Sequence, residues 1–201
     1  YELIGRLVGS EMCIRDSAYR VPEGHKIRVS ISNCYWPLLW PTPDKDTLTL
    51  VQGKFDLPIS THGDFDERKF QPAVVGEPWK IKSLREAGNQ RNVKRDLKSG
   101  IVTTEIIDDF GKRMDQEHGL ITGSTAREWW SIHPDDPLSA HGRTHWTEEI
   151  ERADWSVRTE TYAEMWSDYE TFYLKASLMA FHNGDLVFEK EFNEEIQRLG
   201  H

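Results

Sequence analysis

Apolar and polar residues alternate along most of the second half of the chain, and this pattern is typical of half-buried β-strands. The clearest case is the stretch 155–166. One predicted face of that strand carries Trp155, Val157, Thr159, Thr161 and Ala163, and the opposite face carries Arg158, Glu160 and Glu164. We therefore expect a strand with one face packed and one face in water.

Similar stretches predict further strands, and turn residues separate them. The predicted strands span 92–97, 101–107, 127–132, 142–152, 172–181 and 186–192. Asn183-Gly184 lies between the last two and is the strongest hairpin signal in the chain. Lys98-Ser99-Gly100 predicts a second hairpin.

The first half of the chain gives weaker strand signals. Ile27, Val29 and Ile31 alternate with polar residues and predict a strand, and two short strands are expected at 47–51 and 55–59. Residues 60–92 read as a long irregular connection. Because no amphipathic helix of three turns is present, the pattern favours an all-β sandwich.

Residues 1–17 look foreign to the rest of the sequence. The string LVGSEMCIRDS, Leu7 to Ser17, resembles the translation of a transposon-type sequencing adaptor. Arg6, Glu11 and Arg15 interrupt any apolar core, so a signal peptide is not indicated. We expect residues 1–17 to be an unstructured adaptor artefact, and residues 18–201 to be one domain that is truncated at its N-terminal side.

Composition narrows the functional classes. The chain has 201 residues and a formal net charge of -9, which disfavours nucleic-acid binding. No stretch of about 18 apolar residues predicts a membrane span. The two cysteines form no disulfide framework and no metal-ligand spacing, and this favours a cytoplasmic location. No cofactor is expected.

Potential metal ligands are densest at 133–145, where the chain holds His133, Asp135, Asp136, His141 and His145. Residues four apart on a strand share a face but lie about 13 Å apart. Zinc needs each ligand nitrogen at about 2 Å. A Pro-Asp turn that feeds a strand is therefore the preferred interpretation of this cluster, and no metal site is predicted.

A family resemblance is carried by Gly24-His25-Lys26-Ile27-Arg28-Val29-Ser30-Ile31-Ser32 and by Trp36-Pro37. This motif resembles the C-terminal domain of CocE/NonD-type hydrolases, which are relatives of cocaine esterase and X-prolyl dipeptidyl peptidases. Lys26 stands where the family usually has Arg. The segments 135–140 and 155–161 resemble one branch of the family that has an extended C-terminal sheet.

The resemblance implies a jelly-roll-like β-sandwich, galactose-binding-like in fold, with an extended antiparallel C-terminal sheet. It also implies that the parent protein carries an α/β-hydrolase domain with a Ser-His-Asp triad, together with a helical cap. Those two domains are the expected partners, and homo-oligomerisation is left open. A hydrolase acting on esters, amides or X-Pro peptides is the implied parent.

The chain itself has no G-x-S-x-G nucleophile motif, and Gly123-Ser124-Thr125 has the wrong spacing for one. No catalytic residue is therefore predicted here, and the expected function is that of a non-catalytic C-terminal domain. Its surface should expose an apolar patch where the missing domain docks.

The proline-rich stretch 35–41 predicts an ordered aromatic loop with Tyr35, Trp36 and Trp40. Rigid aromatic side chains on a proline-fixed backbone suit a domain interface, because they lose little entropy on binding. Tyr35, Trp36 and Trp40 are therefore the predicted contacts with the hydrolase domain. The alternative is a carbohydrate-binding β-sandwich in which the same rings stack on sugars.

Overall fold

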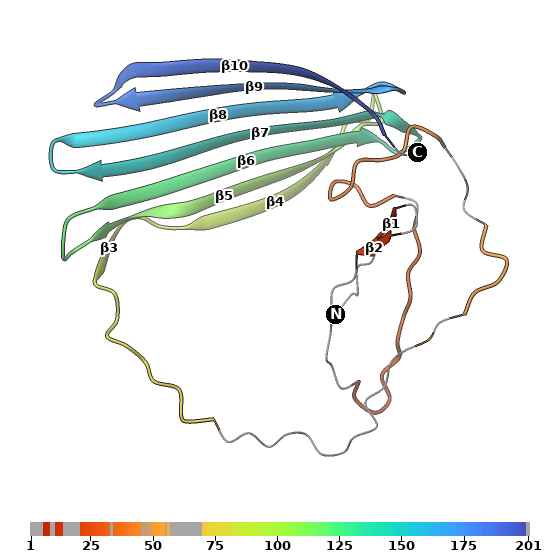
Figure 1. Cartoon of the computed structure of the whole chain (residues 1–201), viewed down its shortest axis with the longest axis horizontal. Helices are drawn as coiled ribbons and strands as arrows, with labels where there is room; N and C mark the ends of the chain where they lie inside the picture. Colours follow the sequence, from red (N-terminus) through yellow and green to blue (C-terminus); the bar gives the residue numbers. More distant parts are fainter. Residues whose placement is uncertain are drawn as a thin grey trace.

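Figure 1 shows the computed structural model of the chain, part of which is described. The described residues are 21–32, 34–45, 47, 49–54, 56 and 70–199, together with the backbone of two short strands near the N-terminus. These are β1 (Arg6–Val8) and β2 (Glu11–Cys13), which pair antiparallel. The rest of segment 1–17 lies outside the described residues, so its adaptor origin stays a prediction.

Eight strands form one antiparallel sheet in the second half of the chain (Figure 1). They are β3 (Ile81–Arg85), β4 (Gly88–Arg95), β5 (Val102–Asp115), β6 (Ile121–His133), β7 (Asp136–Arg152), β8 (Trp155–Ser167), β9 (Thr171–His182) and β10 (Asp185–Gln197). The order is β10-β9-β8-β7-β6-β5-β3, and β4 pairs with the first part of β5 beside β3. The prediction of an all-β protein with an extended antiparallel C-terminal sheet is confirmed.

Both predicted hairpins occur at the expected turns. Asn183 and Gly184 have positive φ angles of 51° and 92° and connect β9 to β10. Two consecutive left-handed residues give the tight turn whose twist matches that of the strands. Gly100, with φ of 79°, ends the turn between β4 and β5.

The register separates the sheet into two chemically different faces, because paired residues point to the same side. One face, here called the polar face, includes Trp129, Arg143, Glu164, Lys175 and Asn193, which are successive partners across β6 to β10. Arg158 and Glu160 fall on this face as well, as the alternation predicts.

The other face, here called the apolar face, carries most of the large hydrophobic side chains. Its members include Phe110, Ala126, Trp130, Trp146, Ile150, Trp155, Val157, Ala163, Met165, Phe172, Leu174, Leu178, Phe188, Phe192 and Ile196. Among the described hydrophobic residues, only Ala126 and Ala140 are buried. The apolar face is thus largely open to solvent.

Some predicted boundaries were wrong. β5 continues to Asp115, and β6 begins at Ile121, although the predicted strands ended at 107 and began at 127. The register shifts between Asp109 and Lys112, where Gly111 has a φ of 81°. This β-bulge interrupts the alternation of apolar and polar residues, so the sequence pattern does not predict the part of the β5–β6 hairpin beyond it.

The first half of the chain departs further from expectation. Residues 26–32 form no strand, and neither do the described residues of 47–51; the predicted strand 55–59 lies almost wholly outside the described residues. Alternation is not sufficient for a strand, because its backbone groups also need a neighbour to pair with. Conversely, β3 and the first part of β4 lie within 60–92, which was expected to be irregular, whereas the end of β4 falls in the predicted strand 92–97. Both are short, polar strands without apolar alternation.

Across the part of the chain that the structure describes, no helix is long and apolar enough to span a membrane.

Candidate functional site

The aromatic loop, residues 35–41, folds back on itself before it reaches the sheet. The Leu39 N–H donates to the Tyr35 carbonyl over 2.9 Å, and the Trp36-Pro37 peptide is cis. The rings of Trp36 and Trp40 meet edge to face, with centroids 5.0 Å apart and planes at 85°. The loop therefore presents two crossed indole rings from a compact turn.

Both indole rings dock on one end of the apolar face. Trp36 lies 5.8 Å from Trp130 of β6, and Trp40 lies 5.9 Å from Phe172 of β9, each ring pair in an edge-to-face arrangement. The Trp40 Nε1–H also donates to Ser167 Oγ of β8 over 3.1 Å. Three strands thus hold the loop, and Trp36 and Trp40 are half-buried.

Trp130 can reach the loop because its neighbour on β7 has no side chain. A Cβ atom on Gly142 would lie 2.6 Å from the Trp130 ring, closer than two carbon atoms can approach. The indole therefore lies over the β7 backbone at this point. Position 142 requires glycine because the Trp130 ring lies so close to the β7 backbone, and not because the backbone has a positive φ.

Arg198 fastens the loop to the end of the sheet. Its Nη2 donates to the Pro41 carbonyl over 2.8 Å, and its Nη1 donates to Ser167 Oγ and to the Asp168 carbonyl. The guanidinium also lies over the Phe172 ring, 4.6 Å from its centroid. Burial lowers the Arg198 pKa below its usual value, although the Asp168 and Asp44 carboxylates favour the charged form.

Tyr35 is the most exposed of the three predicted interface residues, with 36% of its surface accessible. The structure brings Trp36 and Trp40 together on this chain's own sheet. Whether Tyr35, Trp36 and Trp40 also contact a hydrolase domain stays a prediction. Sequence reasoning missed Arg198 and Phe172, because no local pattern connects them to a loop that lies about 130 residues or more away in the chain.

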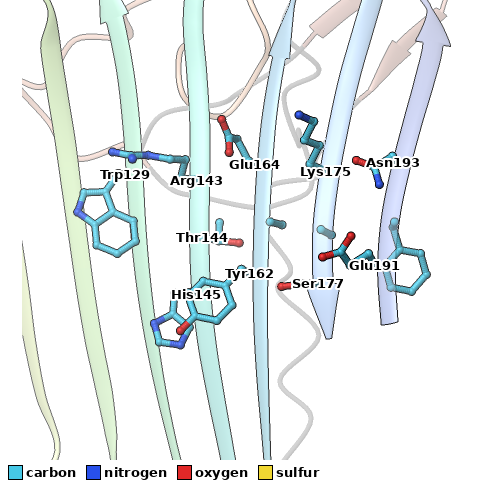
Figure 2. A pocket seen from close by; sticks show the side chains of 13 residues that line it. Trp129, Arg143, Thr144, His145, Tyr162, Glu164, Lys175, Ser177, Glu191 and Asn193 are labelled. Atoms are coloured by element: carbon cyan, nitrogen blue, oxygen red, sulfur yellow. The ribbon is translucent and has the colours of Figure 1, made fainter. Parts of the chain in front are cut away.

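The polar face is hollowed across β6 to β10, and Figure 2 shows the side chains around this hollow of about 470 Å³. Arg143 lies over the Trp129 ring at 5.8 Å, and Lys175 lies over the Trp166 ring at 5.3 Å. Neither cation forms an ion pair with a described carboxylate. Glu164 and Glu191 line the same hollow, so its charges balance.

His145 lies in this hollow beneath Tyr162, with ring centroids 4.1 Å apart and planes at 7°. Burial lowers the His145 pKa, and the positive charge of Arg127 lowers it further. Ser177 lines the hollow too, but β8 lies between it and β7. Two strand spacings separate His145 from Ser177 by about 9.6 Å, too far for a nucleophile and its base.

The histidines and aspartates of 133–145 that were considered as metal ligands make contacts with different partners. His141 Nε2 lies 2.8 Å from Glu164 Oε1, and His133 Nδ1 accepts a hydrogen bond from the Asp135 N–H. Asp136 accepts a hydrogen bond from the Leu138 N–H within the turn, which is the role expected of a turn aspartate. The described residues contain no group of three or more ligands that could hold a metal ion.

The five tryptophans of β6 to β8 are distributed over both faces of the sheet. Trp129 and Trp166 lie on the polar face, whereas Trp130, Trp146 and Trp155 lie on the apolar face. The Trp129 Nε1–H donates to Glu105 Oε1 over 3.0 Å.

Comparison with known proteins identifies the part of the chain that carries the aromatic loop. The family model of the X-Pro dipeptidyl-peptidase C-terminal non-catalytic domain matches residues 5–91. Residues 5–91, less than half of the chain, are thus similar to that domain. The suspected resemblance to the C-terminal domain of CocE/NonD-type hydrolases is thereby confirmed. No curated protein and no solved structure matches the chain.

The matched segment of the non-catalytic domain ends within β4, so most of the sheet lies beyond it. It begins at residue 5, inside the stretch for which an adaptor origin is predicted. The aromatic loop belongs to the matched segment, and the strands that hold it do not. The contacts of Trp36 and Trp40 therefore join the matched segment to the C-terminal sheet.

Proposed function

We propose that this chain is the accessory part of a serine hydrolase of the X-Pro dipeptidyl-peptidase or acyl-esterase type. The nucleophilic serine then lies in an α/β-hydrolase domain of the same protein, and a cap domain completes its substrate pocket. The family match carries this proposal, because the matched domain is described as the non-catalytic C-terminal domain of such peptidases.

The chemistry of the described residues is consistent with a supporting role. In the polar hollow, Ser177 and His145 are two strands apart, and burial and the charge of Arg127 lower the His145 pKa. We infer that the aromatic loop extends from the family domain to lock the C-terminal sheet in a fixed position. The exposed Tyr35 is then available to contact the hydrolase domain.

The arrangement of the aromatic loop gives less support to carbohydrate binding. Sugar stacking uses the flat face of an aromatic ring, and the crossed rings of Trp36 and Trp40 each meet another ring of the chain's own sheet. A sugar would have to displace these contacts, so we do not favour this function.

Two measurements test the proposed function. The purified chain should neither hydrolyse p-nitrophenyl esters or X-Pro p-nitroanilides nor react with a fluorophosphonate probe for activated serines. Antibodies raised against the chain should capture, from its source, a protein much larger than 23.4 kDa that the same probe labels. Labelling of a serine within this chain would contradict the proposal, as would capture of an unlabelled protein of only 23.4 kDa.

A further inference from the structure

The hollow on the polar face of β6 to β10 is open because the side chains around its centre lean away from it. Glu164 turns to His141, and the Lys175 ammonium lies over the Trp166 ring, 5.3 Å from its centroid. Arg143 leans the other way, over a ring of β6. These three side chains leave a volume of about 470 Å³, which is within the range of small-molecule binding sites.

Three charged groups that line the hollow have no polar partner of their own. Elsewhere on the sheet, cations meet carboxylates; Lys112 Nζ, for example, lies 3.0 Å from Glu149 Oε1. Within the part of the chain that the structure describes, no side-chain hydrogen bond or ion pair is found for Arg143, Lys175 or Glu191. A guanidinium, an ammonium and a carboxylate therefore keep their hydrogen-bonding capacity for a ligand.

The nearest carboxylate does not neutralise the two cations. Glu164 is the direct cross-strand partner of both Arg143 and Lys175, a position in which opposite charges normally attract each other. Its Oε1 instead lies 2.8 Å from His141 Nε2. Because this contact holds Glu164, both cations remain available.

Free charges of opposite sign lie at opposite ends of the hollow. Arg143 comes from β7 and Glu191 from β10, with β8 and β9 between them, and Figure 2 shows them on either side of the hollow. Three strand spacings place about 14 Å between their backbones. An extended peptide covers about 3.5 Å per residue, so about four residues reach from one end to the other.

The surface between the two ends suits an uncharged peptide backbone. Tyr162 is 41% accessible and provides an aromatic surface, and Ser177 adds a hydroxyl group beside it on β9. Asn193 on β10 contributes an amide, which both donates and accepts hydrogen bonds as a peptide group does. Polar groups thus continue along the whole length of the hollow.

The mixed charge of the hollow selects against a ligand that carries only one sign. A simple anion would face the carboxylates of Glu164 and Glu191, and a simple cation would face Arg143 and Lys175. Like charges brought together in this way reduce affinity and so exclude the wrong ligand. A molecule with one carboxylate and one ammonium group pairs with both ends at once.

We propose that the hollow binds a short peptide of about four residues with free ends, its C-terminal carboxylate on Arg143 and its N-terminal ammonium on Glu191. The guanidinium fork matches a carboxylate through two parallel hydrogen bonds. The inference does not depend on the proposed function. It requires no hydrolase domain, and the hollow lies outside the segment that matches the family.

Isothermal titration calorimetry of the purified chain with tetraalanine provides the test, because this peptide carries charge only at its two ends. The same peptide is compared in N-acetylated, C-amidated and doubly capped forms. We expect each single cap to weaken binding about tenfold, since it removes one charged group that is hydrogen-bonded to the protein.

Variants at the two ends of the hollow assign each cap to one residue. In Arg143→Met, amidation should no longer weaken binding, whereas acetylation still should; Glu191→Gln should show the converse. Arg152→Met on β7 and Glu189→Gln on β10 are the matched controls, because both residues are exposed on the same strands and lie outside the hollow. The control variants should respond to both caps.

Two results would overturn the inference. Absence of binding, or equal affinity for the doubly capped peptide, would show that the hollow does not recognise the ends of a peptide. Caps that weaken binding equally in Arg143→Met, Glu191→Gln and the controls would place the binding site elsewhere. Neither result affects the proposed function, whose own tests measure serine labelling and the size of the captured protein.

Discussion

Arg198 provides a quantitative test of how the aromatic loop is attached. The perturbation is Arg198→Met, which keeps a long apolar side chain over Phe172 but removes the guanidinium. One hydrogen bond, to the Pro41 carbonyl, joins the loop, and two others hold Ser167 and Asp168 at the end of the sheet. The variant should loosen the loop and leave the strands intact.

The expected loss of stability is the difference between the hydrogen bonds that are lost and the desolvation of the charge that is relieved. A hydrogen bond to a charged group stabilises a protein by about 1.5–3 kcal/mol. Removing a buried charge also relieves its desolvation, which offsets much of the sum of three such bonds. We therefore expect the free energy of unfolding to fall by about 2 kcal/mol, most of it from the loss of the hydrogen bond between Arg198 and the Pro41 carbonyl.

Urea unfolding and amide hydrogen exchange measure the two consequences separately. The Leu39 amide, which is protected by its bond to Tyr35, should exchange faster in Arg198→Met, whereas amides in the middle of β7 and β8 should not change. Arg152→Met is the control, because Arg152 is exposed at the end of β7. Unchanged Leu39 protection, or equal stability losses in the two variants, would refute this account of the attachment.

Three further predictions concern single positions. Gly142→Ala should displace the Trp130 ring, so that acrylamide quenches the tryptophan fluorescence more strongly; unchanged quenching would contradict the close approach. The His145 pKa is lowered in the folded chain, so the free energy of unfolding should fall as the pH drops below about 6.5 toward that lower pKa. His145→Gln should flatten this part of a plot of melting temperature against pH. Parallel plots for the variant and the unchanged chain would contradict the prediction. Gly184→Ala should lower the free energy of unfolding by about 1 kcal/mol in urea, because an alanine at positive φ is strained. Gly88→Ala, where a Cβ meets open space, should cost less, and an equal loss would contradict the strain argument.

The C-terminal sheet could be predicted from the sequence because its determinants are local. Trp155 to Glu164 alternate in the period of a strand, and Asn183-Gly184 specify the turn that follows. Each signal lies within the element that it defines. The all-β class, the β9–β10 hairpin and the division of β8 into two faces were therefore predicted correctly.

Features that depend on distant partners could not be predicted in this way. The bulge at Gly111 interrupts the alternation of β5, so the pattern predicted a strand about half as long. Residues 27–31 alternate well but have no neighbouring strand to pair with among the described residues. The position of Trp40 depends on its contacts with Ser167 and Phe172, which lie far along the chain. No local sequence pattern indicates these contacts.

The most direct test of the central claim is to map which serine of the captured protein carries the fluorophosphonate. Peptide mass spectrometry should find the probe on a serine outside these 201 residues, in a protein that also yields peptides from β6 to β10. A probe attached to Ser177, or to any other serine of this chain, would mean that the sheet itself carries out the chemistry and would contradict its accessory role.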